Sequence, residues 1–253
     1  MYSYNGYKLL FLHPMSDNLA TFLAKSKVKA ADLEHKRKLS FNIDKYAATV
    51  VKGKQQYADL DLARKRAKNI KWRAIENLDK NLELFETNFT KRGGKVIWAE
   101  DANEALEAVL QICKSKNAKQ VVKSKSMVTE EIGLNKIIER NECEVVETDL
   151  GEYILQVDDC DPPSHIVVPA LHKNRMQIRD VFKEKIDYQG SDDPEELTRY
   201  VRDYIRHDFL EADIGITGCN FAVAESGTVS LVTNEGNARL ATSLPKTHIA
   251  VMG

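Results

Sequence analysis

Polar residues suited to binding a small molecule are concentrated in a glycine-rich segment between Ala212 and Arg239. Two apolar runs in this segment, 213–217 and 228–233, are typical of strands, and polar side chains occupy the turns beside them. Glycine lets a ligand approach main-chain N–H groups, and nearby hydroxyl and amide groups can complete an anion site. We therefore expect a small-anion site here, although ordinary glycine turns in a buried sheet would give the same pattern. The expected ligand-binding residues are Asn220, Ser226, Gly227, Thr228, Asn234, Gly236, Asn237 and Arg239.

Glu225 is the catalytic candidate in this segment. It lies in the sequence Ala-Glu-Ser-Gly-Thr, where a carboxylate beside a glycine turn could attack an acyl group or move a proton. The alternative is a structural carboxylate that accepts hydrogen bonds from the amides of the turn.

A second candidate site is the run Lys-Ser-Lys-Ser at 123–126, between an expected strand and the start of a helix. Lys123 and Lys125 beside helix N–H groups would suit a phosphate or a carboxylate, although they could also be surface lysines. Ligands of open α/β sheets bind outside the carboxyl ends of the strands, where both candidate sets are expected. The chain contains no Walker or GxGxxG pattern that would indicate a nucleotide site.

Histidine and cysteine spacing predicts no metal site in this chain. The histidines considered, His165, His172 and His248, lack HxxE or HxH spacing. None of the four cysteines forms a CxxC pair, so neither a zinc site nor an iron–sulfur cluster is expected. Scattered cysteines of this kind are typical of buried thiols in a reducing compartment. The cysteines are Cys113, Cys143, Cys160 and Cys219.

The composition is that of a globular protein. Of the 253 residues, 43% are hydrophobic and 30% are charged, and the net charge of −1 argues against a general nucleic-acid binder. No apolar run approaches the roughly 18 residues that a membrane helix needs. The run Leu9–Leu12 is too short for the core of a signal peptide, so we expect a cytoplasmic protein.

The elements that must position these residues alternate between strands and helices. Such alternation predicts a mostly parallel sheet covered by helices on both faces. A helix with one apolar stripe is expected from 60 to 92, and further helices at 101–116, 129–141, 174–185 and 194–211. Strands are expected at 94–99, 120–123, 143–147, 153–156, 164–169, 213–217, 228–233 and 248–252.

Two regions are expected, a helical N-terminal extension over 1–60 and an α/β domain over 61–253. The extension carries a basic stretch between Lys25 and Lys38, which is most simply a solvated surface and alternatively a docking surface for an acidic partner or an anionic membrane. The last strand reaches almost to Gly253. From this we expect the chain to be part of a longer polypeptide or a shortened natural variant.

Several segments together resemble a known family. The run GITGCNFAVAESGTVSLVTNEGNAR at 215–239, the run KSKSMVTEEIGLN at 123–135 and the run PSHIVVPALHKNR at 163–175 are similar to the lactate-utilisation (LUD) domain family, most closely to its iron–sulfur members in three-protein systems for L-lactate oxidation. The resemblance covers roughly 60–253. It implies a three-layer α/β/α sandwich with an open sheet, like that of sugar-phosphate isomerases and coenzyme A transferases.

The resemblance also implies cofactors and partners. Such members carry two [4Fe–4S] clusters in a ferredoxin-like C-terminal part, which this sequence lacks, so no cofactor is expected in this chain. The first functional hypothesis is a LUD domain of a lactate-oxidising complex that binds a small anion such as lactate, or binds other subunits. The second is a free-standing coenzyme A transferase-like or isomerase-like enzyme that uses Glu225. The third is a non-catalytic interaction module.

Overall fold

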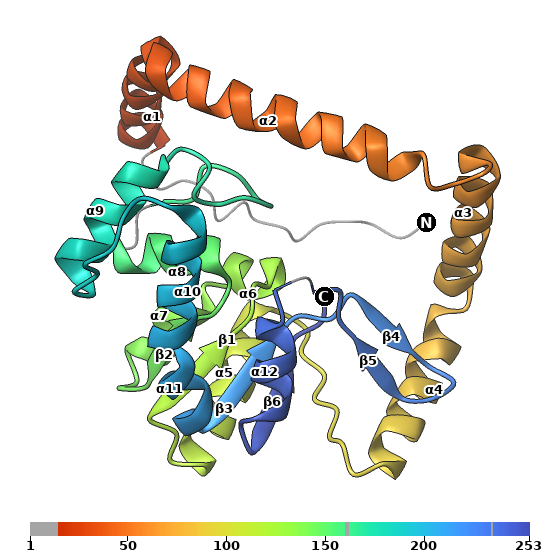
Figure 1. Cartoon of the computed structure of the whole chain (residues 1–253). Helices are drawn as coiled ribbons and strands as arrows, with labels where there is room; N and C mark the ends of the chain where they lie inside the picture. The colour runs from red at the N-terminus through yellow and green to blue at the C-terminus, as the bar shows by residue number, and fades with distance from the viewer. Residues whose placement is uncertain (1–14, 160–161, 234) are drawn as a thin grey trace. The chain divides into compact units, whose positions relative to one another are not determined.

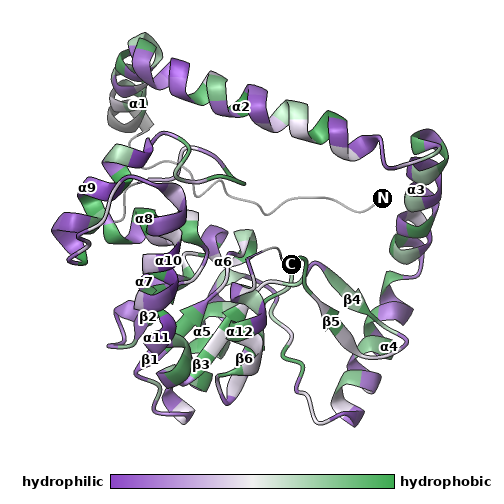
Figure 2. Ribbon diagram, in the orientation of Figure 1, coloured by the Kyte–Doolittle hydropathy of each residue, from purple (hydrophilic) through white to green (hydrophobic). Residues whose placement is uncertain are grey.

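The computed structural model describes residues 15–159, 162–233 and 235–253 (Figure 1). The chain divides into two compact units, Met1–Gly53 and Lys54–Gly253. In the first unit, helices α1 (Met15–Ala31) and α2 (Leu33–Lys54) confirm the expected helical extension, and α2 has no buried residue. Figure 2 shows hydrophobic and hydrophilic residues mixed along both helices. The boundary at residue 60 stays a prediction. No helix in the described ranges is long and apolar enough to cross a membrane.

The second unit is built on a four-stranded sheet in the order β2-β1-β3-β6, in which all neighbouring strands are parallel. The strands are β1 (Gln120–Lys123), β2 (Glu144–Glu147), β3 (Ile214–Thr217) and β6 (Thr247–Ala250). These four strands and the parallel sheet confirm the sequence prediction. Lys123 is level with Glu147 across β1 and β2, so the two strands end side by side at the same edge of the sheet.

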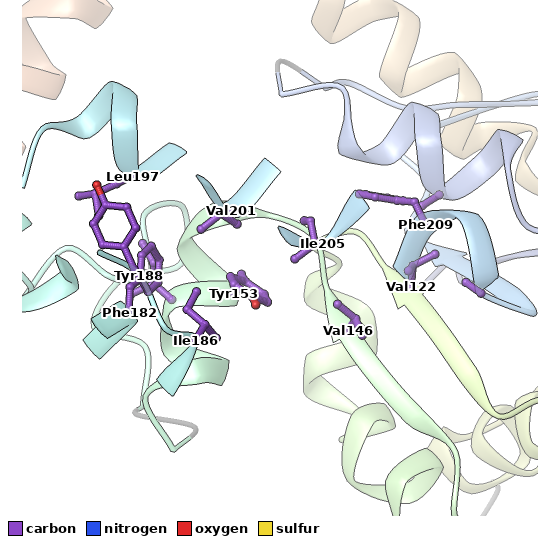
Figure 3. Close-up of a cluster of buried hydrophobic side chains, with 13 residues drawn as sticks. Val122, Val146, Tyr153, Phe182, Ile186, Tyr188, Leu197, Val201, Ile205 and Phe209 are labelled. Carbon is purple, nitrogen blue, oxygen red and sulfur yellow. The ribbon is translucent and has the colours of Figure 1, made fainter. Parts of the chain in front are cut away.

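Helices cover both faces of the sheet, which confirms the three-layer α/β/α fold. Alternate residues of β1 point to opposite faces, so Val121 joins one hydrophobic cluster and Val122 the other. The Val121 cluster includes residues of α5 (Ala102–Ser115) and α7 (Leu134–Glu139). The Val122 cluster, shown in Figure 3, includes residues of α8 (Leu150–Val157), α9 (Arg175–Lys185), α10 (Pro194–Tyr204), α11 (Arg206–Glu211) and α12 (Asn237–Ser243).

Helix starts follow the expected capping chemistry. Asp101 accepts hydrogen bonds from the backbone of the first turn of α5, and Asn174 forms a capping box with Gln177 at the start of α9. Pro194 occupies the first turn of α10 behind Asp193, at the start of the helix expected over 194–211, which Ile205 divides into α10 and α11.

The prediction of a single helix over 60–92 was wrong. Two helices, α3 (Leu60–Glu76) and α4 (Leu78–Lys91), meet at Asn77. The Asn77 side chain donates to the carbonyl of Arg73, and such side-chain bonds compete with the helical pattern. The helix expected over 129–141 is likewise two short helices, α6 (Met127–Glu131) and α7, separated by Gly133 at φ 69°.

Three predicted strands are absent from the described sheets. Residues 94–99 form no ladder, and 153–156 belong to α8, whose first turn is capped by Asp149. In 164–169, the Nδ1 atom of His165 accepts the N–H groups of Val167 and Val168, so the backbone turns. A short apolar run does not by itself distinguish a strand from a helix or a turn.

The run expected as a strand over 228–233 lies outside the parallel sheet. Only its first part is a strand, β5 (Thr228–Ser230), which pairs antiparallel with β4 (Phe221–Val223). The hairpin packs on α4, where the Asn88 amide donates to the carbonyls of Ala224 (2.9 Å) and Glu225 (3.2 Å).

Candidate functional site

Buried polar side chains in the described ranges gather at one place, the carboxyl ends of β1, β2 and β3. Parallel strands ending at one edge leave room between their loops, and ligands of open α/β sheets bind there. We call this set the polar cluster. Its members are Lys123, Ser124, Ser126, Thr129, Glu147, Thr148 and Thr217.

A buried ion pair lies at the centre of the polar cluster. Lys123 Nζ is 2.8 Å from Glu147 Oε1, with the two side chains 0% and 9% exposed. Glu147 Oε1 also accepts a hydrogen bond from the Asn135 amide at 2.6 Å. Apart from this contact with Glu147 Oε1, no described residue accepts a hydrogen bond from Lys123 Nζ, and Glu147 Oε2 has no hydrogen-bond partner among the described residues. The last residues of β1 and β2 therefore hold two charged groups with unused hydrogen-bonding capacity.

A pocket of about 190 Å³ lies at the same end of the sheet, walled in part by the loop that follows β1. Lys125 in its wall pairs with Glu152 of α8 at 2.5 Å. Burial raises the pKa of Glu130, also in the wall; the charge of Glu152 raises this pKa further, and Lys123 and Lys125 oppose the rise. The wall thus carries two carboxyl groups and one ammonium. The lining residues are Lys125, Met127, Glu130, Glu152, Pro163, Ser164, His165 and Ile166.

Hydrogen bonds join the loops around the polar cluster. The Thr148 hydroxyl and N–H both donate to the carbonyl of Lys123 at 2.9 Å, and the Asn237 amide donates to the Thr148 hydroxyl at 3.3 Å. Gly236, at φ 84°, precedes α12 and turns the chain toward this contact. Asn237 is therefore linked to Lys123 through Thr148, while Arg239 lies exposed on α12; the binding roles predicted for these residues stay predictions.

The hydroxyl of Thr217 completes the cluster on the β3 side. It donates to the carbonyl of Gly218 at 2.9 Å and lies 2.9 Å from His248 Nε2. Burial lowers the pKa of His248, which favours the neutral ring that donates one N–H to Thr217. This histidine has a hydrogen-bonding partner in the fold and requires no metal to explain its position.

The other predicted site residues belong to the β4–β5 hairpin. Asn220 lies at its base, where the side-chain oxygen accepts the N–H of Val232 at 2.8 Å. Glu225, Ser226, Gly227 and Thr228 lie at its turn, and the hydroxyl of Ser226 donates to that of Thr228 at 2.8 Å. None of these residues lines the pocket beside Lys125. Asn234 lies outside the described residues.

Gly227 has a packing explanation. Its φ is 60°, and a Cβ atom at this position would lie 2.4 Å from the backbone nitrogen of Phe89 in α4. The turn that contains Glu225 is therefore held against a helix. The roles predicted for Glu225 and its neighbours stay predictions.

The sequence reading missed the acidic partners of the two lysines. Glu130, Glu147 and Glu152 are not among the site residues expected from the sequence. One signal was available: Glu147 ends a predicted strand, as Lys123 does, and adjacent parallel strands bring such residues together. The sequence also suggested that N–H groups at the start of a helix would help Lys123 and Lys125 to bind an anion. That helix, α6, is short and offers only a few amides. One of them, the N–H of Thr129, already donates to Ser126 Oγ at 3.4 Å.

The cysteines of the described ranges do not fit an iron–sulfur cluster. Cys113 and Cys143 line a second cavity, of about 300 Å³, near the starts of β1 and β2, whereas Cys219 follows the end of β3. All three are free, and no group of three or more His, Cys, Asp or Glu in these ranges could hold a metal ion. A [4Fe–4S] cluster needs a set of cysteine thiolates in one place. Cys160 lies outside the described residues.

Comparison with known proteins identifies relatives. Lactate utilization protein B of Bacillus licheniformis and that of Bacillus subtilis are each 60% identical over 190 residues, which is 75% of this chain and 40% of either relative. Lactate utilization protein B of Geobacillus thermodenitrificans is 61% identical over the same length. The chain thus spans less than half the length of these relatives. No solved structure matches it. The model of the LUD domain matches residues 82–253, more than half of the chain, and the chain therefore belongs to the LUD domain family.

Proposed function

We propose that this chain provides the LUD domain of a protein that acts in lactate utilisation, in the oxidation of L-lactate to pyruvate. In this proposal, its domain binds a small anion such as lactate at the polar cluster and the adjoining pocket, and it docks with other subunits of the system. The identity to proteins named lactate utilization protein B supports the biological role. The observation that carries the binding site is the gathering of every described buried polar side chain at the carboxyl ends of three parallel strands.

Charge balance determines how an anion would bind. Lys125 is the ammonium in the pocket wall, and it is already paired with Glu152, while Glu130 adds a second carboxyl group. A bound carboxylate would therefore face an excess of negative charge at neutral pH. Protonation of Glu130, whose pKa burial already raises, would remove that excess. Anion binding is accordingly coupled to proton uptake and should strengthen as the pH falls.

In this proposal, electrons are carried by redox groups that the described residues of this chain do not hold. The three described cysteines are distributed over two ends of the sheet and do not form a cluster site. The domain's contribution would be to bind and orient the ligand or a partner subunit. Free thiols fit a reducing compartment, so we place the protein in the cytoplasm.

The test is calorimetric titration of the full chain with L-lactate, D-lactate and pyruvate at pH 5.5 and pH 8. We expect L-lactate to bind, with affinity rising by up to about tenfold per pH unit as Glu130 protonates. Lys125→Met should weaken binding, whereas Lys185→Met, which removes a lysine paired with Asp159, should not. If none of the three acids binds, and no lactate-oxidation subunit associates with the chain, the proposal is wrong.

A further inference from the structure

The imidazole ring of His165 is held in one orientation by its own loop. Its Nδ1 atom accepts hydrogen bonds from the backbone N–H groups of Val167 and Val168, each at 3.1 Å. A ring nitrogen that accepts N–H groups carries no hydrogen of its own, so the proton of the neutral ring lies on Nε2. His165 therefore presents a hydrogen-bond donor at the edge of the ring that faces away from these amides.

The loop that carries His165 is closed and packed. The N–H and the hydroxyl of Ser164 both donate to the carbonyl of Pro169, at 3.0 Å and 3.3 Å. The Pro169 side chain is fully buried, and a Cβ atom added to Gly151, in the first turn of α8, would lie 2.9 Å from it. Because the loop is fixed against a helix, the orientation of the His165 ring is set before any ligand arrives.

The same ring lines the pocket of about 190 Å³ beside Lys125. Since Nδ1 is turned toward the backbone, the edge of the ring left for the pocket is the one that carries Nε2. Among the described residues, Nε2 has no hydrogen-bond partner. The Lys125 ammonium, by contrast, is paired with Glu152, and the Ser164 hydroxyl donates to Pro169. The wall of the pocket thus contains an N–H group that is positioned by the fold and is not yet used.

A neutral donor suits the charge of this wall. Glu130 and Glu152 place two carboxyl groups beside the single ammonium of Lys125. A charged donor in such a wall pairs with the carboxylates first, as Lys125 does with Glu152. The Nε2–H group of a neutral imidazole has no such counter-charge to leave, and its hydrogen bond to an ionised acceptor is stronger than one to a neutral acceptor.

We infer that His165 binds the carboxylate of the acid that occupies this pocket, by donating a hydrogen bond from Nε2–H. The inference rests on the proposed function and names a residue that receives the ligand's charged group. The bond between Nδ1 and the two backbone N–H groups orients the ring for this contact. His165 binds and orients the ligand, and no proton is transferred.

The test uses two substitutions that separate the two edges of the ring. His165→Asn keeps an oxygen that can accept the backbone N–H groups in place of Nδ1, as asparagine does in turns, but is too short to place a donor where Nε2 lies. By calorimetry at pH 7, we expect it to weaken binding of L-lactate and of pyruvate about 10-fold or more, and by a similar factor, since both acids carry the carboxylate. His165→Gln, whose longer side chain carries an amide donor, should restore most of the affinity. The control His207→Asn changes an exposed histidine paired with Glu211 on α11 and should leave both affinities unchanged.

Proton–nitrogen correlation NMR of the histidine rings at pH 8 tests the orientation without any ligand. The signals lost in His165→Asn should belong to a ring with its proton on Nε2, and a proton on Nδ1 would overturn the inference. A folded His165→Asn variant that binds both acids as well as the unaltered chain does would show that the ring only holds the turn, and would overturn the inference while the proposed function stands. A loss confined to one acid would also overturn it, because the ring would then contact a group other than the carboxylate. If neither acid binds the unaltered chain, the proposed function fails and the inference fails with it. Thermal melting of each variant shows whether it is folded.

Discussion

Replacing Lys123 with methionine would keep most of the apolar stem and remove the ammonium from a fully buried position. The Glu147 carboxylate, only 9% exposed, would then be left without its counter-charge. Breaking a buried ion pair by removing one partner costs about 3–5 kcal/mol, because the remaining charge stays desolvated. For a domain of this size, the melting temperature should fall by about 6–20 °C.

The double variant Lys123→Met/Glu147→Leu should recover most of that loss. Replacing both ions with apolar groups of similar volume is often neutral or stabilising, so the two substitutions should not be additive. Urea unfolding at pH 7 of the two single variants and the double variant measures the coupling. Lys185→Met is the control: Lys185 and Asp159 form a pair that is more exposed, and such pairs contribute about 1 kcal/mol or less.

A loss below about 1 kcal/mol for Lys123→Met would refute this reasoning, since a desolvated pair cannot be broken so cheaply. Additive effects of the two single substitutions would also refute it. Either result would mean that water reaches the carboxyl ends of β1 and β2 in the folded protein. The burial that underlies the candidate site would then be incorrect.

Three further predictions concern other parts of the fold. Gly227→Ala should destabilise the domain by about 1–3 kcal/mol in urea unfolding, because the new Cβ meets Phe89 and the backbone is held at positive φ; an unchanged stability would contradict the packing of the hairpin on α4. Burial raises the pKa of Glu130, so ionisation of this carboxyl opposes folding. As the pH rises from the unfolded-state pKa of Glu130 through its folded-state pKa, the unaltered protein should lose stability relative to Glu130→Gln. Below the unfolded-state pKa, the two proteins should not differ in their free energy of unfolding. A pH-independent difference would show that the carboxyl is not desolvated. Burial raises the pKa of Cys143 to about 11, so alkylation at pH 8, followed by peptide mass spectrometry, should modify it more slowly than the partly exposed Cys219; equal rates would contradict its burial.

The parts of the fold that depend on local sequence were predictable. Alternating helices and strands indicated the parallel sheet, and the helices expected from 101 and from 174 begin there in the structure, where Asp101 and Asn174 cap them. Errors arose where a local pattern is ambiguous. Residues 153–156 look like a strand in isolation, but Asp149 caps the segment and it packs as helix α8.

The candidate site was only partly predictable, because it depends on pairing between distant segments. Lys123 and Lys125 were identified from their position after a strand, and the structure adds that each is paired with a glutamate from a later segment. The register that sets Glu147 opposite Lys123 is a property of the assembled sheet. Similarly, residues 221–230 were expected at the rim of the parallel sheet. They form a hairpin against α4 because Asn88 and Phe89, more than a hundred residues earlier, provide the surface that receives the turn.

The contact between the hairpin turn and α4 has a practical consequence for anyone who engineers this domain. In the sequence, the stretch around Ser226 and Gly227 looks like a natural place to insert a tag, a fluorophore or a circular-permutation break, since turns of small polar residues usually accept them. Here an insertion would displace the backbone from Asn88 and separate the turn from the helix that supports it.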